Sequence, residues 1–159
     1  NFRNTLFFNR LNPKFGMEYT INASKSKVLL TRGFDFNQRF EHENRFRWNI
    51  SKSFNLNLKY LTGYKKSVAN YSVNRNYFYN TNLREATISY HPNTKFRYAL
   101  LGEFSIKQNQ SDLNETAKNI KIGNEVRFNQ VKKGSFSAEF NLQLCMYDGA
   151  ENTLIAIEM

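Results

Sequence analysis

Apolar and polar residues alternate strictly along several stretches of this chain. In FSAEFNLQLCM (136–146), the even positions from Phe136 to Met146 are apolar and the odd positions are mostly polar. Successive side chains of a β-strand point to opposite faces, so a period of two predicts a strand with one apolar face. That face is turned either toward a protein core or toward lipid, and the two cases lead to different functions.

The same alternation recurs along the chain, without a helical period and without a linker. Further strands are predicted at 15–23, 46–50, 54–64, 86–90, 96–106 and 120–128, and the opening stretch adds one more. About eight or nine strands of this kind predict an all-β fold, an antiparallel up-and-down meander. We expect residues 1–159 to form one unit with no internal domain boundary.

Short and long connections alternate between the predicted strands. Tight turns are expected around Pro13 and at 51–53, 91–95 and 129–135, whereas longer loops are expected at 24–40, 65–83, 107–119 and 148–152. In an up-and-down sheet this alternation puts all turns at one end and all loops at the other. Outer-membrane barrels have this asymmetry, with short periplasmic turns and longer extracellular loops.

Aromatic residues of the apolar face gather near the tight turns, and leucines lie deeper in the strands. Aromatic girdles on either side of an aliphatic band are typical of the lipid-facing surface of a barrel. The candidates for such a girdle are Trp48, Phe54, Tyr90, Phe96, Phe128 and Phe136.

The opposite face carries charges of both signs, which suits a water-filled lumen. We expect Arg45 to face Lys59 across the 51–53 turn, and Arg127 to pair with Glu139 across the 129–135 turn. The lumen-facing candidates are Arg45, Arg47, Lys59, Arg97, Glu103, Glu125, Arg127 and Glu139.

Composition leaves this interpretation open. The formal net charge is +10, but the basic residues are dispersed, and aromatic and basic residues fall on opposite faces, so no nucleic-acid partner is expected. Mean hydropathy is −0.66, which for helices would indicate a soluble protein; membrane strands alternate their faces and can have low averages. A soluble antiparallel β-sandwich serving as a binding module remains an alternative, although its strands usually have about 5 or 6 residues.

Residues suited to catalysis or metal binding are few. His42 lies between Glu41 and Glu43, but adjacent residues of a strand point to opposite faces. His91 is expected in a solvated turn, and Cys145 lies in an alternating strand without a motif around it. We expect no enzyme activity, no catalytic or metal residues and no cofactor.

Three segments resemble a known group of proteins. NISKSFNLNLKY (49–60), VLLTRGFDFNQRFEHENRFRW (28–48) and ENTLIAIEM (151–159) are similar to the C-terminal barrel regions of large, poorly characterised outer-membrane proteins of Bacteroidota. The resemblance implies an outer-membrane location in a Gram-negative bacterium, and assembly by the barrel-assembly machinery. Such barrels end on a terminal aromatic residue, whereas this chain ends at Met159, so we expect it to be a fragment that pairs with the remainder of its own chain in the bilayer.

Two functions fit such a barrel. The first is a pore, or a transport or secretion barrel, with the charged face as its path. The second is a membrane anchor that displays upstream domains or adhesive, ligand-binding loops, whose extracellular ligand is unknown. Candidates for loop contacts lie in the predicted loop 65–82, and they are Tyr71, Tyr77, Phe78 and Tyr79.

Overall fold

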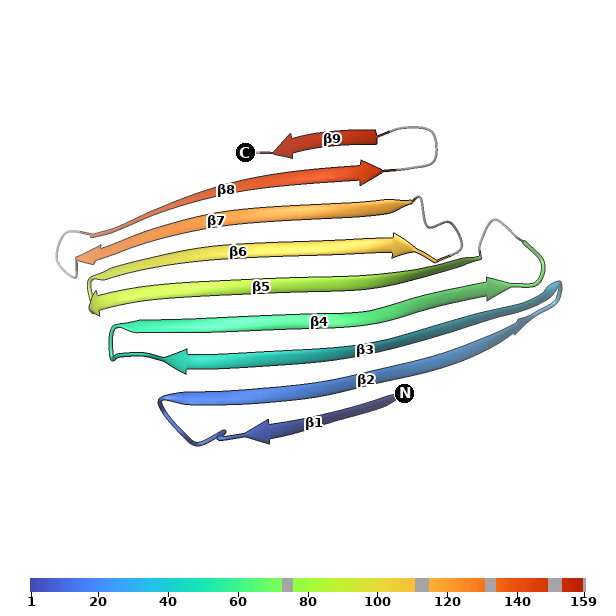
Figure 1. Ribbon diagram of the computed structural model, residues 1–159, viewed down its shortest axis with the longest axis horizontal. Helices are drawn as coiled ribbons and strands as arrows, with labels where there is room; N and C mark the ends of the chain where they lie inside the picture. Colours follow the sequence, from blue (N-terminus) through green and yellow to red (C-terminus); the bar gives the residue numbers. More distant parts are fainter. Residues whose placement is uncertain (73–75, 111–114, 131–133, 149–152, 159) are drawn as a thin grey trace.

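The described part of the chain folds into one antiparallel sheet of nine strands (Figure 1). The computed structural model describes residues 1–72, 76–110, 115–130, 134–148 and 153–158. Strand order in the sheet follows the order in the sequence, so every strand pairs with its neighbours along the chain. The predicted fold class, an all-β up-and-down meander, is confirmed. The sheet is open, with β1 and β9 at its two edges.

Most of the strands are long. Their bounds are β1 (Phe2–Phe8), β2 (Phe15–Leu30), β3 (Gly33–Asn49), β4 (Phe54–Ala69), β5 (Tyr77–Asn93), β6 (Phe96–Asn109), β7 (Thr116–Gln130), β8 (Gly134–Asp148) and β9 (Thr153–Glu158). The six strands β3 to β8 each have 14 to 17 residues. Such lengths exceed the five or six residues that are typical of globular proteins.

Strand register sorts the side chains onto two faces. Phe46 of β3 lies opposite Met17 of β2 and Leu58 of β4, so these three share a face. We call it the apolar face; it carries the even-numbered residues of β3 to β8 and the odd-numbered residues of β2. The neighbouring residues, such as Arg45 opposite Lys59, form the polar face.

Among the described residues, the predicted long loops at 24–40, 65–83 and 107–119 are mostly strand, whereas residues 149–152 of the predicted loop 148–152 lie outside the described part of the chain. The prediction of a loop at 24–40 is wrong, because β2 continues to Leu30 and β3 begins at Gly33. Likewise β4 continues to Ala69, and β5 begins at Tyr77. In β2 the alternation ends at Lys25 and Lys27 on the apolar face, but backbone pairing does not require an apolar face; in β3, Phe34, Phe36 and Phe40 continue the alternation. The strands therefore continue beyond the apolar stretches, at the end of the sheet opposite the tight turns.

The sheet is a single layer without a core. No large side chain among the described residues is fully buried. The buried side chains are small, and they lie on the polar face: Ala69, Ala99, Thr20 and Ser89. The accessible surface is 11649 Å², whereas a compact folded protein of this mass exposes about 8,300 Å². The apolar face is thus left uncovered, with Trp48 45% and Phe140 56% exposed.

Candidate functional site

The polar face gathers the eight residues that were predicted to share one side. Register puts Arg45 and Lys59 directly opposite each other, as predicted. The other six lie on the same face of β3 and β6 to β8. The pattern of alternation was therefore sufficient to group them.

Six charged residues form a continuous row across this face. Cross-strand partners link them one to the next, in the order Glu18, Arg45, Lys59, Glu85, Glu103 and Lys121. Two steps of the row bring like charges together, Arg45 beside Lys59 and Glu85 beside Glu103. Directly opposed like charges destabilise a sheet unless other partners compensate them.

Ion pairs provide part of this compensation. Lys59 Nζ lies 3.3 Å from Glu85 Oε2 on the next strand, and Arg45 pairs with Glu43 along its own strand. A further ion pair lies outside the row, nearer the tight turns, where Arg127 Nη2 is 2.6 Å from Glu125 Oε1. Each pair is partly exposed and contributes at most about 1 kcal/mol, so the face is suited to contact with water rather than to a packed core.

One predicted pair on this face is wrong. Arg127 lies opposite Ser137, and Glu139 lies opposite Glu125. The strands end at Gln130 and begin again at Gly134, which centres the hairpin one residue earlier than predicted. Glu139 accepts a hydrogen bond from Asn141 Nδ2 at 2.7 Å.

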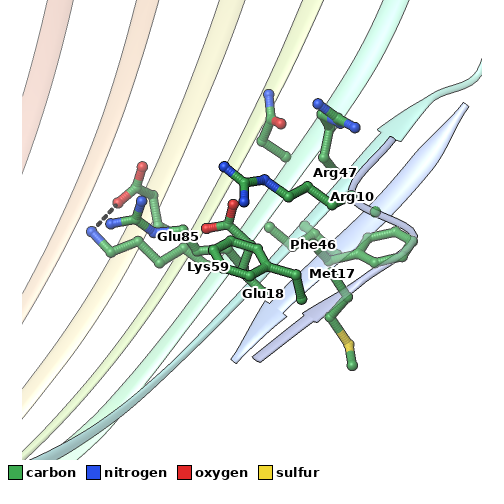
Figure 2. A pocket seen from close by; sticks show the side chains of 12 residues that line it. Arg10, Met17, Glu18, Phe46, Arg47, Lys59 and Glu85 are labelled. Atoms are coloured by element: carbon green, nitrogen blue, oxygen red, sulfur yellow. Dashed lines mark hydrogen bonds and ion pairs between the residues drawn. The ribbon is translucent and has the colours of Figure 1, made fainter. Parts of the chain in front are cut away.

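A cleft of about 580 Å³ lies at the β1–β5 side of the polar face. Figure 2 shows Arg10, Glu18, Arg47, Lys59 and Glu85 among its lining, with Met17 pointing away from the charged groups. Arg10 follows β1 in the first turn, and its guanidinium carbon lies 4.5 Å from the ring centroid of Phe7. Sequence analysis missed Arg10, because alternation assigns no face to a turn residue.

The tight turns carry the predicted girdle on the apolar face. Register aligns Phe54 with Tyr90, and aligns Phe96, Phe128 and Phe136 in one row. Trp48 is aligned with Phe15, which was not among the candidates although it follows the Pro13 turn. The aromatic row moves two residues toward the turns between β3 and β4, and again between β5 and β6. A barrel with tilted strands requires such a stagger.

Polar residues on the apolar face are bound to tyrosines. Tyr98 Oη donates to Asn124 Oδ1 at 2.8 Å, and Tyr19 Oη lies 2.6 Å from His42 Nδ1. Gln38 Nε2 donates to Tyr64 Oη at 2.7 Å. A polar group in an apolar environment needs such a partner, so these tyrosines make the exceptions in the alternation compatible with an apolar surrounding.

The histidines and the cysteine form no shared centre. Glu41 and Glu43 lie on the polar face and His42 on the apolar face, as the alternation predicted. The prediction of a turn position for His91 is wrong: it belongs to β5, and its Nε2 lies 3.1 Å from Asn55 Nδ2. Within the described ranges, no group of three His, Cys, Asp or Glu residues is placed to hold a metal ion.

Three of the four loop-contact candidates lie in a strand. Tyr77, Phe78 and Tyr79 belong to β5 and β4 continues to Ala69, so most of the predicted loop 65–82 is strand. The rings of Tyr77 and Tyr79 stack at 5.5 Å on the polar face, while Phe78 lies on the apolar face opposite Lys66. Tyr71 Oη donates to Asp35 Oδ2 at 2.9 Å.

The fold and its faces define a class of protein, a single-layer all-β sheet with one apolar and one charged face. Comparison with protein-family models, with curated protein sequences and with solved structures found no match. No helix in the described part of the chain is long and apolar enough to cross a membrane.

Proposed function

We propose that this sheet is part of the wall of a transmembrane β-barrel in the outer membrane of a Gram-negative bacterium. The observation that carries the proposal is the uncovered apolar face, on which Leu58 is 40% and Ile122 is 45% exposed. A large contiguous apolar surface marks contact with lipid or with a partner. Lipid covers it without any second layer of protein.

The height of the apolar surface supports this proposal. Outward-facing residues are uncharged over 15–23 in β2, 96–106 in β6, 120–128 in β7 and 136–146 in β8. Nine to eleven residues at about 3.3 Å each, tilted by about 45°, span roughly 21 to 26 Å. The apolar band of outer-membrane barrels is about 25 Å tall.

The alternative of a soluble β-sandwich is less favoured. A sandwich buries its apolar faces between two sheets packed about 10 Å apart. The described residues form one sheet, and all strand contacts are between sequence neighbours. A soluble protein would need another layer to cover residues such as Trp48 and Phe140.

The open edges indicate further partners. β1 and β9 each have one neighbour in the sheet, and unpaired backbone groups cannot remain exposed within a bilayer. We propose that further strands close the barrel, supplied by the remainder of the chain and joined by the barrel-assembly machinery.

Within this frame we propose a non-enzymatic pore, or a transport or secretion barrel. The charged row from Glu18 to Lys121 would face the lumen, where water and opposite charges satisfy it. A second candidate is a membrane anchor with a surface-exposed binding site. It is favoured by the stacked pair Tyr77 and Tyr79, with Lys65 Nζ 5.5 Å from the ring centroid of Tyr77.

The test compares two adjacent positions of β4. We expect Leu58→Arg to disrupt assembly, because Arg near the bilayer midplane costs about 2 to 4 kcal/mol. Asn57→Arg is the matched control, since Asn57 lies on the polar face. The readouts are recovery in the outer-membrane fraction and the heat-modifiable migration of the folded barrel. Recovery of the intact wild-type protein in the soluble fraction, or equal tolerance of both substitutions, would contradict the proposal.

A further inference from the structure

On the apolar face, basic residues follow the uncharged stretches on the side away from the tight turns. On β2, β4, β5 and β7, the first outward-facing residue beyond the uncharged stretch is basic. On β2 the next outward-facing residue is basic as well. We call these five residues the outer cation collar; they are Lys25, Lys27, Lys66, Arg84 and Lys118. All five are exposed; Lys25, Lys27, Lys66 and Lys118 lie toward the end of the sheet opposite the tight turns, and Arg84 lies near the middle of β5.

The outer cation collar has an excess of positive charge, because acidic residues are scarce on the apolar face that the structure describes. The ion pairs formed by Arg39, Arg45, Lys59 and Arg127 all lie on the polar face. On the apolar face, Asp148 at the end of β8 is the one acidic residue among the side chains that the structure describes. The turn end of the same face has aromatic residues such as Trp48 and Phe128 in place of cations. On this face the positive charge therefore lies beyond the uncharged stretches, from the level of Arg84 near mid-strand to that of Lys27 and Lys66 toward the loop end.

Aromatic rings hold three of these cations against the sheet. Lys27 Nζ lies 4.5 Å from the ring centroid of Phe34. The corresponding distances are 5.9 Å from Lys66 Nζ to Phe78 and 6.0 Å from Arg84 Cζ to Tyr60. Cations over aromatic faces are partly ordered, so their charges stay at the rim of the apolar surface.

An apolar groove on the same face is lined by Arg84 and by residues nearer the tight turns, such as Ala86 and Gly102. Its volume is about 510 Å³, and two of its lining residues, Ala86 and Gly102, are small. The other outward-facing residues along it include Leu58, Tyr60, Phe104 and Ile122. A groove lined mainly by apolar groups, with Arg84 in its lining, offers contacts to both the acyl chain and the headgroup of a lipid molecule.

We propose that the outer cation collar binds the phosphate groups of membrane lipids, and that the groove lined by Arg84 takes an acyl chain of one of them. The inference rests on the proposed membrane location. Basic residues at a membrane surface attract anionic lipids by an amount that corresponds to about fivefold in affinity for each residue. An uncharged headgroup gains nothing from this attraction.

The experiment uses the full chain in neutral maltoside micelles that contain equal amounts of phosphatidylglycerol and phosphatidylcholine. Native mass spectrometry counts the lipids of each kind that remain bound. We expect the wild type to retain phosphatidylglycerol preferentially. The triple variant Lys66→Gln, Arg84→Gln, Lys118→Gln should lose this preference, by up to about fivefold for each charge removed.

The matched control removes three exposed cations from the turn end, in Lys14→Gln, Lys52→Gln and Lys95→Gln. It changes the net charge equally and should keep the preference. Gly102→Leu should fill the groove and reduce the number of tightly bound lipids without changing the charge. Equal loss in both triple variants, or an unchanged preference in the collar variant, would overturn the inference.

Two further outcomes separate the proposals. If inorganic phosphate displaces phosphatidylglycerol at stoichiometric amounts, the collar is a site for free phosphate, which overturns the assignment to lipid. If the wild type shows no heat-modifiable migration and retains neither lipid, the membrane location itself fails. A barrel that inserts normally but binds both lipids alike would overturn the collar inference alone.

Discussion

At the scale of single residues, side chains on the apolar face behave according to their height. Leucine and isoleucine such as Leu58 and Ile122 lie in the middle of the strands, aromatic residues lie at the turn end and also farther along, as at Phe140, and lysines lie toward the loop end. Tyr19, Tyr64 and Tyr98 each bind a polar side chain on the same face. The face is thus graded along the strand direction, which is what the proposed bilayer location requires.

Trp48 gives a direct test of this grading, because it is the one tryptophan of the chain. We expect it to lie at the headgroup level on the turn side. Its fluorescence, isolated as the difference between the wild type and Trp48→Phe in vesicles, should be quenched more by nitroxides near the headgroup than by nitroxides at the chain ends. Stronger quenching at the bilayer centre would contradict the predicted height, and quenching by iodide alone would contradict contact with lipid.

At the scale of strands, two glycines differ in how closely the neighbouring strand approaches. A Cβ built on Gly63 of β4 would collide with the backbone of β3, where Glu41 Cα would lie only 2.8 Å away. A Cβ on Gly102 of β6 meets nothing within 4 Å. The β3–β4 pairing therefore depends on glycine at position 63, whereas the β5–β6 pairing does not depend on glycine at 102.

We expect Gly63→Ala to destabilise the folded state by about 1 to 3 kcal/mol, the usual cost of forcing extra atoms into a closely packed site. Gly102→Ala should change stability by less than about 0.5 kcal/mol. The measurement is the urea midpoint of unfolding in detergent, followed by heat-modifiable migration. Equal midpoints for the two variants would mean that β3 moves away at little cost.

At the scale of the whole molecule, the polar face carries both signs of charge at similar density. A lumen lined by Lys59, Glu85, Glu103 and Lys121 in one row presents no single sign to a passing ion. The proposed pore should accordingly discriminate weakly between cations and anions, since rings of one sign are what gives charge selectivity.

This expectation can be tested with paired variants in planar bilayers. Lys59→Gln with Lys121→Gln should shift the reversal potential toward cation selectivity, because Glu85 and Glu103 are left uncompensated. Glu85→Gln with Glu103→Gln should shift it in the opposite direction. A folded, inserted barrel without any conductance would favour the anchor function over the pore.

The sequence predicted the two faces, the meander and the Arg45–Lys59 pairing, because a period of two and a three-residue turn leave few other arrangements. It did not predict that β2 continues past Ala23, since Lys25 and Lys27 put polar residues on both faces, and it missed the alternation of Phe34, Phe36 and Phe40 in β3. The position of Arg10 also depends on how a turn folds back over a sheet. The single layer with its uncovered face, on which the proposed function rests, was visible only in three dimensions.

The meander has a consequence for folding kinetics. Since each strand pairs with strands adjacent in the sequence, closing any hairpin requires ordering only a short connecting segment. Proteins dominated by contacts of this kind have low contact order and fold quickly for their size. The sheet can therefore grow one hairpin at a time, with each new strand templated by the exposed edge of the strand before it.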